Sequence, residues 1–222
     1  MSDTLPVIEE LRRLLYTPVL SDVLDGFGLM HQALRPFVRP VDDSLVLFGR
    51  VRTGRYAAVA AATPGRNPYA LEMELIDGLQ PGEVPVLACG GPTDVIAPWG
   101  ELLSTAARAR GAAGCLTDGL VRDTARIRAM RFPVFHGGIG PLDTRGRAEM
   151  IEKDTTVEIA GVQAAPGDWV MGDVDGVVII PAGRAEAVFR AALDKIAAED
   201  TTRAELEAGD SLQVVYARHG VL

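Results

Sequence analysis

The sequence predicts one α/β domain with a partly parallel sheet and helical crossovers. The first indication is the alternation of apolar runs and helical stretches across residues 100–136, because strands that alternate with helices are typical of parallel sheets. The second is size: 222 residues, 48% of them hydrophobic, are enough to bury one sizeable core. No long linker or low-complexity tract divides the chain, so a single domain over residues 1–222 is expected.

Two helices are expected in the N-terminal part, residues 1–30. Thr4 is a candidate cap for the first helix, which carries apolar residues at helical spacing. Thr17 is a candidate cap for the second, because Pro18 follows it and proline is favoured in the first helical turn. Gly26 is expected to close this second helix.

Residues 45–145 are predicted to form the β/α core. Short runs rich in Val, Leu and Ala on either side of Gly54 predict two strands within residues 45–63. A helix is expected to open at Asn67 and to stop at Gly78. The core then continues with a buried strand at 84–89, a helix at 100–110, a strand at 113–117, a helix at 123–130 and a strand at 133–136.

Residues 146–181 form a strand-rich portion, and a C-terminal helix is expected over residues 182–208. Turn signals such as Pro166-Gly167 separate the strand-like runs. The terminal helix is amphipathic, with apolar residues at helical spacing on one face. The predicted strands lie at 155–160, 168–171 and 176–180.

Charge and composition restrict the classes of partner. The formal net charge is −8, with acidic residues spread along the chain, which argues against nucleic-acid binding because that function needs clustered Lys and Arg. Residues 1–10 do not resemble a secretory signal, and no apolar run approaches the length of a membrane span, so no membrane partner is expected. Cys89 and Cys115 lie in apolar surroundings and are expected to be free, buried thiols, which fits a cytoplasmic protein.

The residues best suited to chemistry are Glu101, Arg122 and Asp123. Twenty residues separate the first acid from the adjacent Arg-Asp pair, and this spacing allows two carboxylates and a guanidinium to meet in one cleft. Carboxylates bind Mg²⁺ or Mn²⁺, and a guanidinium holds a carboxylate in bidentate fashion. The set therefore predicts a divalent-cation site beside a small anionic substrate.

The start of the helix at 100–110 is a second candidate for substrate binding. Gly100 opens this helix, which leaves the backbone N–H groups of Leu102 and Leu103 without intrahelical acceptors. Such a helix end binds carboxylate or phosphate readily. Segments 63–69 and 132–147 are both able to shape a pocket for the distal half of a substrate, although nothing in them singles out a side chain.

Simpler structural roles stay open for the same residues. Glu101 in the first turn of a helix complements the helix dipole without any further function. Asp123 is able to cap the helix that follows it, with Arg122 in a surface ion pair.

Other reaction classes lack their motifs. The chain contains no G-x-S-x-G, no P-loop and no G-x-G-x-x-G after a strand. Its three histidines lack the spacing of a zinc motif. The two lysines, Lys153 and Lys195, lie in a polar turn and on the terminal helix, so neither indicates the desolvated amine of a Schiff-base aldolase.

Five motifs spread over most of the chain occur together: Gly90-Gly91, W-G-E-L-L at 99–103, D-G-L-V-R-D at 118–123, F-P-V-F-H at 132–136 and G-D-W-V-M-G-D-V-D-G-V-V-I-I-P at 167–181. Together they resemble the RraA-like family, which includes the class II pyruvate aldolases that act on 4-hydroxy-4-methyl-2-oxoglutarate and 4-carboxy-4-hydroxy-2-oxoadipate. The resemblance implies a swivelling β/β/α-type fold. It also implies assembly into a homotrimer or a dimer of trimers, with active sites at the subunit boundaries.

The resemblance also implies roles for the site residues. Asp123 would ligate Mg²⁺ or Mn²⁺ directly, and Glu101 would hold a metal-bound water. Arg122 would bind the pyruvyl part of the substrate and stabilise its enolate. The backbone N–H groups of Leu102 and Leu103 would take the substrate carboxylate.

Two further points follow from the resemblance. An acid on the terminal helix of a neighbouring subunit is implicated in the aldolases, and Glu199 is the nearest candidate here. The aldolases usually carry Asp where this chain has Glu101, and the extra methylene moves the carboxylate by about one carbon–carbon bond.

The activity implied is divalent-metal-dependent retro-aldol cleavage of a 4-hydroxy-2-oxo acid to pyruvate and a second oxo acid or aldehyde. Decarboxylation of oxaloacetate passes through the same enolate, so one site would perform both reactions. The alternative, from a different class, is a ring-shaped, non-catalytic regulator that binds a ribonuclease E-type partner, because some relatives in the family act in that way.

Overall fold

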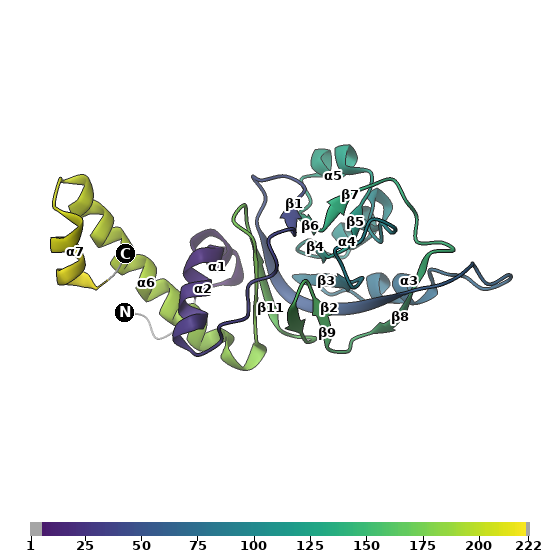
Figure 1. Cartoon of the computed structure of the whole chain (residues 1–222), viewed down its shortest axis with the longest axis horizontal. Coiled ribbons are helices and arrows are strands. Elements are labelled where there is room, and N and C mark those ends of the chain that lie inside the picture. Colours follow the sequence, from purple (N-terminus) through teal and green to yellow (C-terminus); the bar gives the residue numbers. More distant parts are fainter. Residues whose placement is uncertain (1–5, 221–222) are drawn as a thin grey trace.

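A computed structural model describes residues 6–220, and a mixed eight-stranded sheet lies at its centre (Figure 1). Strands β2, β3, β4 and β6 are parallel neighbours, while the outer strands pair antiparallel. The sheet order is β1 (Arg39–Pro40), β6 (Val134–His136), β4 (Cys115–Thr117), β3 (Glu83–Ala88), β2 (Leu47–Ala58), β11 (Trp169–Gly172) and β12 (Val177–Ile180), with β8 (Ala148–Lys153) also paired to β2. The prediction of an α/β domain with a partly parallel sheet is confirmed.

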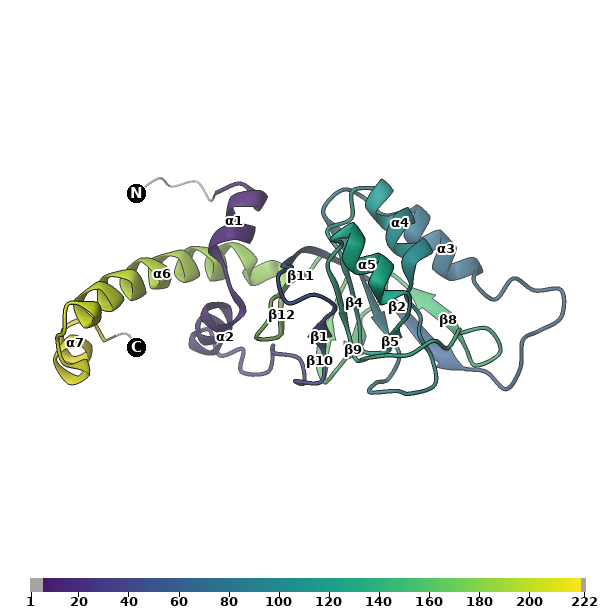
Figure 2. The same ribbon diagram turned by 90° about the horizontal axis from the view of Figure 1, so that it is seen from above.

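Three short helices cover one face of the parallel strands (Figure 2). They are α3 (Ala70–Asp77), α4 (Glu101–Ala109) and α5 (Thr124–Met130). Each connects consecutive parallel strands or precedes one, and their inward side chains, such as Leu75, Ala107 and Ile127, are fully buried against the sheet. The amphipathic patterns of residues 67–136 therefore fold as expected, because each helix can bury its apolar stripe only against the strands.

The opposite face of the sheet packs against a β-hairpin of β9 (Val157–Ile159) and β10 (Val162–Ala164). A separate two-stranded ribbon, β5 (Leu120–Val121) with β7 (Gly138–Ile139), lies beyond the end of β4. This ribbon is important for the site, because residues 122 and 123 continue directly from it.

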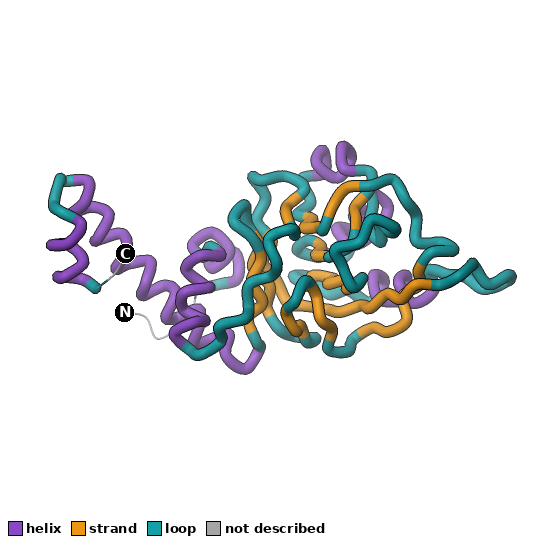
Figure 3. The backbone as a smooth tube through the Cα atoms, viewed as in Figure 1, coloured by secondary structure: helices purple, strands orange, loops and turns teal. Residues whose placement is uncertain are grey.

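A third apolar cluster joins the β11–β12 end of the sheet to helices α1 (Ile8–Leu14), α2 (Thr17–Gly26) and α6 (Ala185–Glu207), the last preceded by a short 3-10 turn, η1 (Ala182–Arg184). At its centre Phe48 stacks on Trp169, and Phe189 meets both rings edge to face, with ring centroids 5.1 to 5.7 Å apart. The far end of α6 and helix α7 (Leu212–His219) extend away from the sheet (Figure 3).

Two local predictions are wrong. Gly54 does not separate two strands: β2 runs through it, and a Cβ there would lie 2.6 Å from Cε of Met150, so glycine is needed where that side chain crosses the strand. Thr17 is not the cap of α2 but its first residue. Its N–H and hydroxyl donate to the buried carboxylate of Asp173 at 2.7 and 2.6 Å, so an acid distant in sequence completes the helix end.

Other predicted boundaries agree with the structure to within a few residues, including α2 ending at Gly26 and α3 ending before Gly78. The sequence patterns did not predict β8, β10 or α7. Thr4, the candidate cap of the first helix, lies outside the described residues. Both cysteines are free, with Cys115 fully buried. Within residues 6–220, no helix combines the length and apolar character that crossing a membrane requires.

Candidate active site

Local backbone pairing brings the two halves of the predicted site together. The N–H of Leu120 donates to the carbonyl of Ile96 at 3.0 Å, and the N–H of Arg122 donates to the carbonyl of Trp99 at 3.0 Å. Trp99 also forms an isolated parallel bridge with Val121. The segment that enters α4 therefore runs beside the segment that enters α5, and both helix starts face the same space.

The fully buried side chain of Trp99 anchors this junction. Its indole Nε1–H donates to the hydroxyl of Ser104 at 2.8 Å, and that hydroxyl donates to the carbonyl of Gly100 at 2.9 Å. The Trp-Gly-Glu-Leu-Leu stretch thus has a structural basis: the tryptophan fixes the start of α4 relative to the strands.

Asp123 adopts an unusual backbone conformation that aims its side chain at α4. Its φ is +58°, in the left-handed region that L-residues other than Asn and Asp rarely occupy. Asp123 stands at the N-cap position of α5, yet its carboxylate makes no hydrogen bond to that helix. Instead Oδ2 accepts the N–H of Glu101, the first residue of α4, at 3.2 Å. The alternative in which Asp123 caps its own helix is therefore wrong, whereas its second part, an ion pair of the half-exposed Arg122, is present.

Gly100 allows this close approach. A Cβ at this position would lie 2.8 Å from Oδ2 of Asp123 and 3.1 Å from Cγ of Arg122. Any larger residue would push the carboxylate and the guanidinium away from the helix end. Arg122 and Asp123 therefore meet at the start of α4, where Glu101 contributes its backbone N–H but not its carboxylate.

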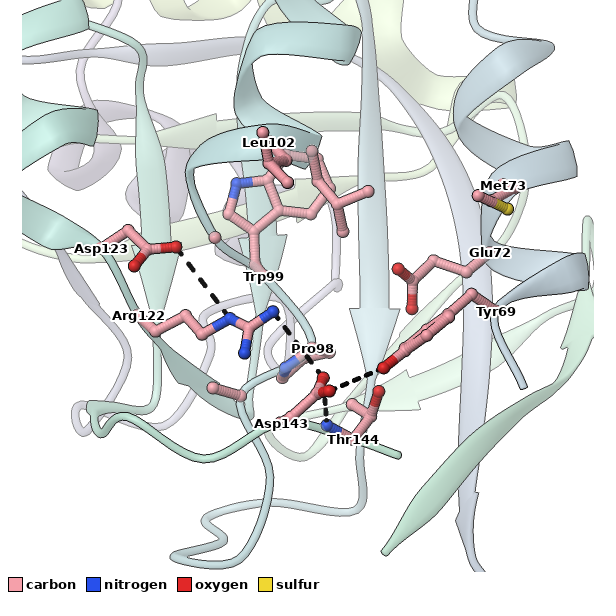
Figure 4. Close-up of a pocket in the computed structure, with 13 residues that line it drawn as sticks. Tyr69, Glu72, Met73, Pro98, Trp99, Leu102, Arg122, Asp123, Asp143 and Thr144 are labelled. Atoms are coloured by element: carbon pink, nitrogen blue, oxygen red, sulfur yellow. Dashed lines mark hydrogen bonds and ion pairs between the residues drawn. The ribbon is translucent and has the colours of Figure 1, made fainter. Parts of the chain in front are cut away.

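A cavity of about 230 Å³ opens in front of these groups (Figure 4). Leu102 and Leu103 line it from the first turn of α4, where Ser104 is the first residue whose N–H bonds back along the helix, to Gly100 at 3.1 Å. The start of α4 therefore presents free N–H groups beside Arg122 and Asp123. The complete lining is Tyr69, Glu72, Met73, Ala97, Pro98, Trp99, Gly100, Leu102, Leu103, Arg122, Asp123, Asp143 and Thr144.

Arg122 is held between two carboxylates. Its Nε lies 4.0 Å from Oδ2 of Asp123, and its Nη2 lies 3.7 Å from Oδ1 of Asp143. Asp143 in turn accepts the hydroxyl of Tyr69 at 2.6 Å and the backbone N–H of Thr144 at 2.8 Å. Burial acts to raise the pKa of Asp143, but the Tyr69 hydrogen bond and the Arg122 charge outweigh it, so this pKa is lowered and the carboxylate stays ionised.

Tyr69 and Glu72 form the wall opposite Arg122 and Asp123 (Figure 4). Burial, together with the hydrogen bond to Asp143, raises the pKa of Tyr69 to about 12, so its hydroxyl remains a donor at neutral pH. Glu72 is 7% exposed and accepts the hydroxyl of Tyr56 through Oε2. Burial raises the pKa of Glu72 to about 7, which makes it a titratable group on the cavity wall.

The remaining predicted site residues lie outside the cavity lining. Glu101 begins α4, and its carboxylate accepts the hydroxyl of Thr105 at 3.2 Å. Glu199 lies on α6, where it accepts the Tyr16 hydroxyl and pairs with Lys195 at 3.4 Å. Figure 1 shows α6 on the far side of the sheet from α3 and α4, so Glu199 does not reach the cavity of its own chain. Its role in a neighbouring subunit stays a prediction.

The buried Asp118, at the end of β4, has a structural role. Its two carboxylate oxygens accept the N–H of Cys89 at 2.6 Å and of Gly91 at 2.8 Å. These bonds tie the glycine loop after β3 to the end of β4, where a Cβ on Gly91 would lie 2.1 Å from the carbonyl oxygen of Asp118.

The donor set suits a cation that keeps most of its water. Within residues 6–220 no group of three or more His, Cys, Asp or Glu side chains is arranged to hold a metal ion. Mg²⁺ and Mn²⁺ do not require such a group, because a site with one or two carboxylates and several waters is usual for Mg²⁺. Asp123, at the open helix end and facing the cavity, fits that type of site.

Sequence patterns did not single out Tyr69, Glu72, Asp143 or Thr144. The two segments expected to shape the pocket, 63–69 and 132–147, do contribute Tyr69, Asp143 and Thr144 to its wall. A signal for Glu72 was present: it precedes Leu75 by three residues and Ile76 by four, so it lies on the buried face of its helix, where an acid is unusual.

Comparisons with known proteins define the family. The family model described as RraA-like, Aldolase/RraA, matches residues 17–179, and the chain belongs to this family. A relative from Halalkalibacterium halodurans, named "Putative 4-hydroxy-4-methyl-2-oxoglutarate aldolase", is 30% identical over 206 residues, which cover 92% of this chain and 90% of that protein.

Solved structures agree on the fold. A protein from Pseudomonas syringae pv. tomato is 23% identical, with a TM-score of 0.80 over 96% of this chain and 99% of that one. Streptomyces coelicolor RraAS2, described as an unusual member of the RNase ES inhibitor RraA protein family, is 24% identical, with a TM-score of 0.78 over 88% of this chain and 94% of that one. At these identities the likeness concerns the fold alone.

Proposed function

We propose that this protein is a class II pyruvate aldolase, which cleaves a 4-hydroxy-2-oxo acid to pyruvate and a second carbonyl product with the help of Mg²⁺ or Mn²⁺. One observation carries the proposal: Arg122, Asp123 and the open start of α4 meet at one end of a single cavity. The name of the Halalkalibacterium relative supports the same class of reaction.

Each group has a task in this reaction. The free N–H groups of Leu102 and Leu103 bind the substrate carboxylate, because a helix start favours anions. Arg122 donates hydrogen bonds to the oxygen on C2, where negative charge develops as the C3–C4 bond breaks. Asp143, which also lines the cavity, holds the guanidinium in this position through an ion pair at 3.7 Å. A base, acting through water, takes the proton of the 4-hydroxyl group as C4 becomes a carbonyl carbon, and the electron pair of the broken bond remains on C3 as the enolate.

Asp123 would hold the metal ion, and Glu101, at the same helix end, would hold a metal-bound water. When bound, the cation supplies a Lewis acid that lowers the energy of the developing enolate. Oxaloacetate decarboxylation forms the same enolate and would be a second activity of the site. A homotrimer or dimer of trimers, with Glu199 of a neighbouring subunit completing the site, belongs to the same proposal.

Two measurements test the function. With Mg²⁺ or Mn²⁺, the protein should exchange the C3 hydrogens of pyruvate for deuterium in D₂O, followed by NMR, and should release pyruvate from oxaloacetate. Exchange requires only the enolate and no distal substrate half. Absence of metal-dependent exchange, or an Asp123→Ala variant as active as the parent, would contradict the proposal.

The alternative regulator of a ribonuclease E-type partner is disfavoured by the same geometry. A protein that only binds a partner has no need for Asp123 in a left-handed backbone conformation beside Gly100. It also has no need for an Arg122 guanidinium held by Asp143. A pull-down in which a ribonuclease lost activity in proportion to the bound chain would favour the regulator over the aldolase.

A further inference from the structure

The wall of the cavity opposite the metal-binding end carries acidic and apolar groups. Tyr69, Glu72 and Met73 form this distal wall, from the start of α3. Figure 4 shows them facing Arg122 and Asp123 across the cavity, with Asp143 between the two sides. If the pyruvyl part of a substrate occupies the Arg122 end, the group attached to C4 must lie against the distal wall.

Charges along the lining are unequal. Among the lining residues that the structure describes, Arg122 alone is cationic, whereas Glu72, Asp123 and Asp143 are acids. The Arg122 charge is already shared by the carboxylates of Asp123 and Asp143. A second carboxylate on a substrate would therefore face acidic groups at the distal wall. Arg145, whose charge acts on Tyr69, is exposed and lies outside the described lining, so no unshared cation within the lining pairs with that carboxylate.

Glu72 is suited to a hydroxyl group instead. Its Oε2 accepts the Tyr56 hydroxyl, and within the described part of the chain Oε1 has no hydrogen-bond partner. Because Glu72 lines the cavity, Oε1 can accept a hydrogen bond from a ligand. The pKa of Glu72, raised to about 7 by burial, indicates that negative charge is already unfavourable at this wall. Met73 and Leu103 complete surroundings that suit a short, uncharged chain.

We infer that Glu72 makes this aldolase selective for 4-hydroxy-2-oxo acids whose C4 carries an uncharged, hydroxylated tail, so that the second product is a hydroxyaldehyde rather than an oxo acid. This inference rests on the proposed function. The reaction balances as a retro-aldol cleavage: 4,5-dihydroxy-2-oxopentanoate gives pyruvate and glycolaldehyde, with the C4 hydroxyl proton lost and one proton gained at C3 of the enolate.

A matched pair of substrates provides the test. 4,5-Dihydroxy-2-oxopentanoate and 4-hydroxy-2-oxoglutarate differ only in a hydroxymethyl or a carboxylate group on C4. In the parent protein with Mg²⁺, at a pH of about 8 where Glu72 is ionised, kcat/KM should favour the first by about tenfold or more, because a like charge about 5 Å away is strongly unfavourable in a partly desolvated site. Equal values, or a preference for the dianion, would overturn the inference.

Two substitutions at the distal wall test whether its charge causes the substrate preference. Glu72→Gln, which still accepts the Tyr56 hydroxyl, and Met73→Lys, on an exposed side chain, should each lower the kcat/KM ratio of the neutral to the dianionic substrate by about tenfold. Glu74→Gln is the matched control: it removes one charge from the same helix, at a residue paired with Lys153 outside the cavity, and should leave the ratio unchanged.

Deuterium exchange into pyruvate distinguishes failure of the inference about the tail from failure of the aldolase proposal. If the parent protein exchanges the C3 hydrogens of pyruvate but prefers the dianionic substrate, or if Met73→Lys leaves the ratio unaltered, the inference about the tail is wrong and the aldolase proposal stands. If metal-dependent exchange is absent, both are wrong. The ratio of kcat/KM values cancels any loss of activity that affects both substrates equally.

Discussion

Replacing Gly100 with alanine should impair the site far more than the fold. The backbone of Gly100 is extended, with φ of −157°, so any residue can adopt its conformation. The new Cβ, however, would lie 2.8 Å from Oδ2 of Asp123, about 0.6 Å inside ordinary van der Waals contact. A site of this kind tolerates shifts of about half an ångström, and a displacement of 1 Å can cost about 100-fold in rate. We therefore expect Gly100→Ala to slow metal-dependent pyruvate exchange by about 30- to 100-fold.

Stability should change much less. Relief of the contact requires movement of Asp123 and of the half-exposed Arg122, so we expect a loss of about 1 to 2 kcal/mol in the free energy of unfolding. Gly26→Ala is the control, because a Cβ at that position meets nothing within 4 Å. Exchange rates and urea denaturation would be measured on all three proteins. A Gly100→Ala variant that keeps more than half of the parent exchange rate would refute the role assigned to the contact.

Three further predictions concern charge and folding. Asp123→Asn should keep the fold, because Asn tolerates the left-handed conformation, and should abolish metal-dependent exchange; activity near the parent value would exclude Asp123 as the ligand. Asp173→Ala should lower the free energy of unfolding by about 2 to 4 kcal/mol, since both donors of Thr17 lose their buried acceptor, while the exchange rate at 20 °C stays the same. Glu72→Gln should raise the free energy of unfolding, compared with the parent protein, by more above pH 7 than at pH 4. The pKa of Glu72 rises from 4.5 to about 7 on folding, so the native state loses up to about 3 kcal/mol of stability as pH rises through this window, and the variant should not; parallel pH–stability curves would contradict this.

The fold was predictable where local pattern and tertiary position agree. Between residues 84 and 136, each strand is a short apolar run and each helix an amphipathic stretch, so sequence periodicity indicates the parallel units directly. Gly54 misled the interpretation because glycine marks both a strand break and a close approach, and only the position of Met150 distinguishes them. Asp173 could not be linked to Thr17, because 156 residues separate them and no local rule connects them.

The site was predictable in the same partial way. Gly100, Arg122 and Asp123 were identified because each belongs to a compact motif, and their contacts now explain why those residue types occur together. The distal wall was not identified from the sequence. Tyr69 and Glu72 line the cavity because α3 packs against the sheet, and a sequence motif does not describe that packing. Sequence motifs therefore indicate the Arg122 end of the cavity better than they indicate the distal wall.

Asp123 shows why the end of the cavity beside α4 is better explained by function than by stability. An aspartate at the N-cap of α5 would ordinarily take an extended conformation and bond its own helix, which contributes about 1 kcal/mol. Here the left-handed backbone costs about 1 kcal/mol or more, and α5 receives no bond from this side chain. In exchange the carboxylate reaches a single N–H of α4, at a long 3.2 Å, and faces the cavity. One weak hydrogen bond and a half-exposed ion pair with Arg122 at 4.0 Å do not offset a lost cap and a strained residue, so the conformation is explained if the carboxylate has a ligand to hold.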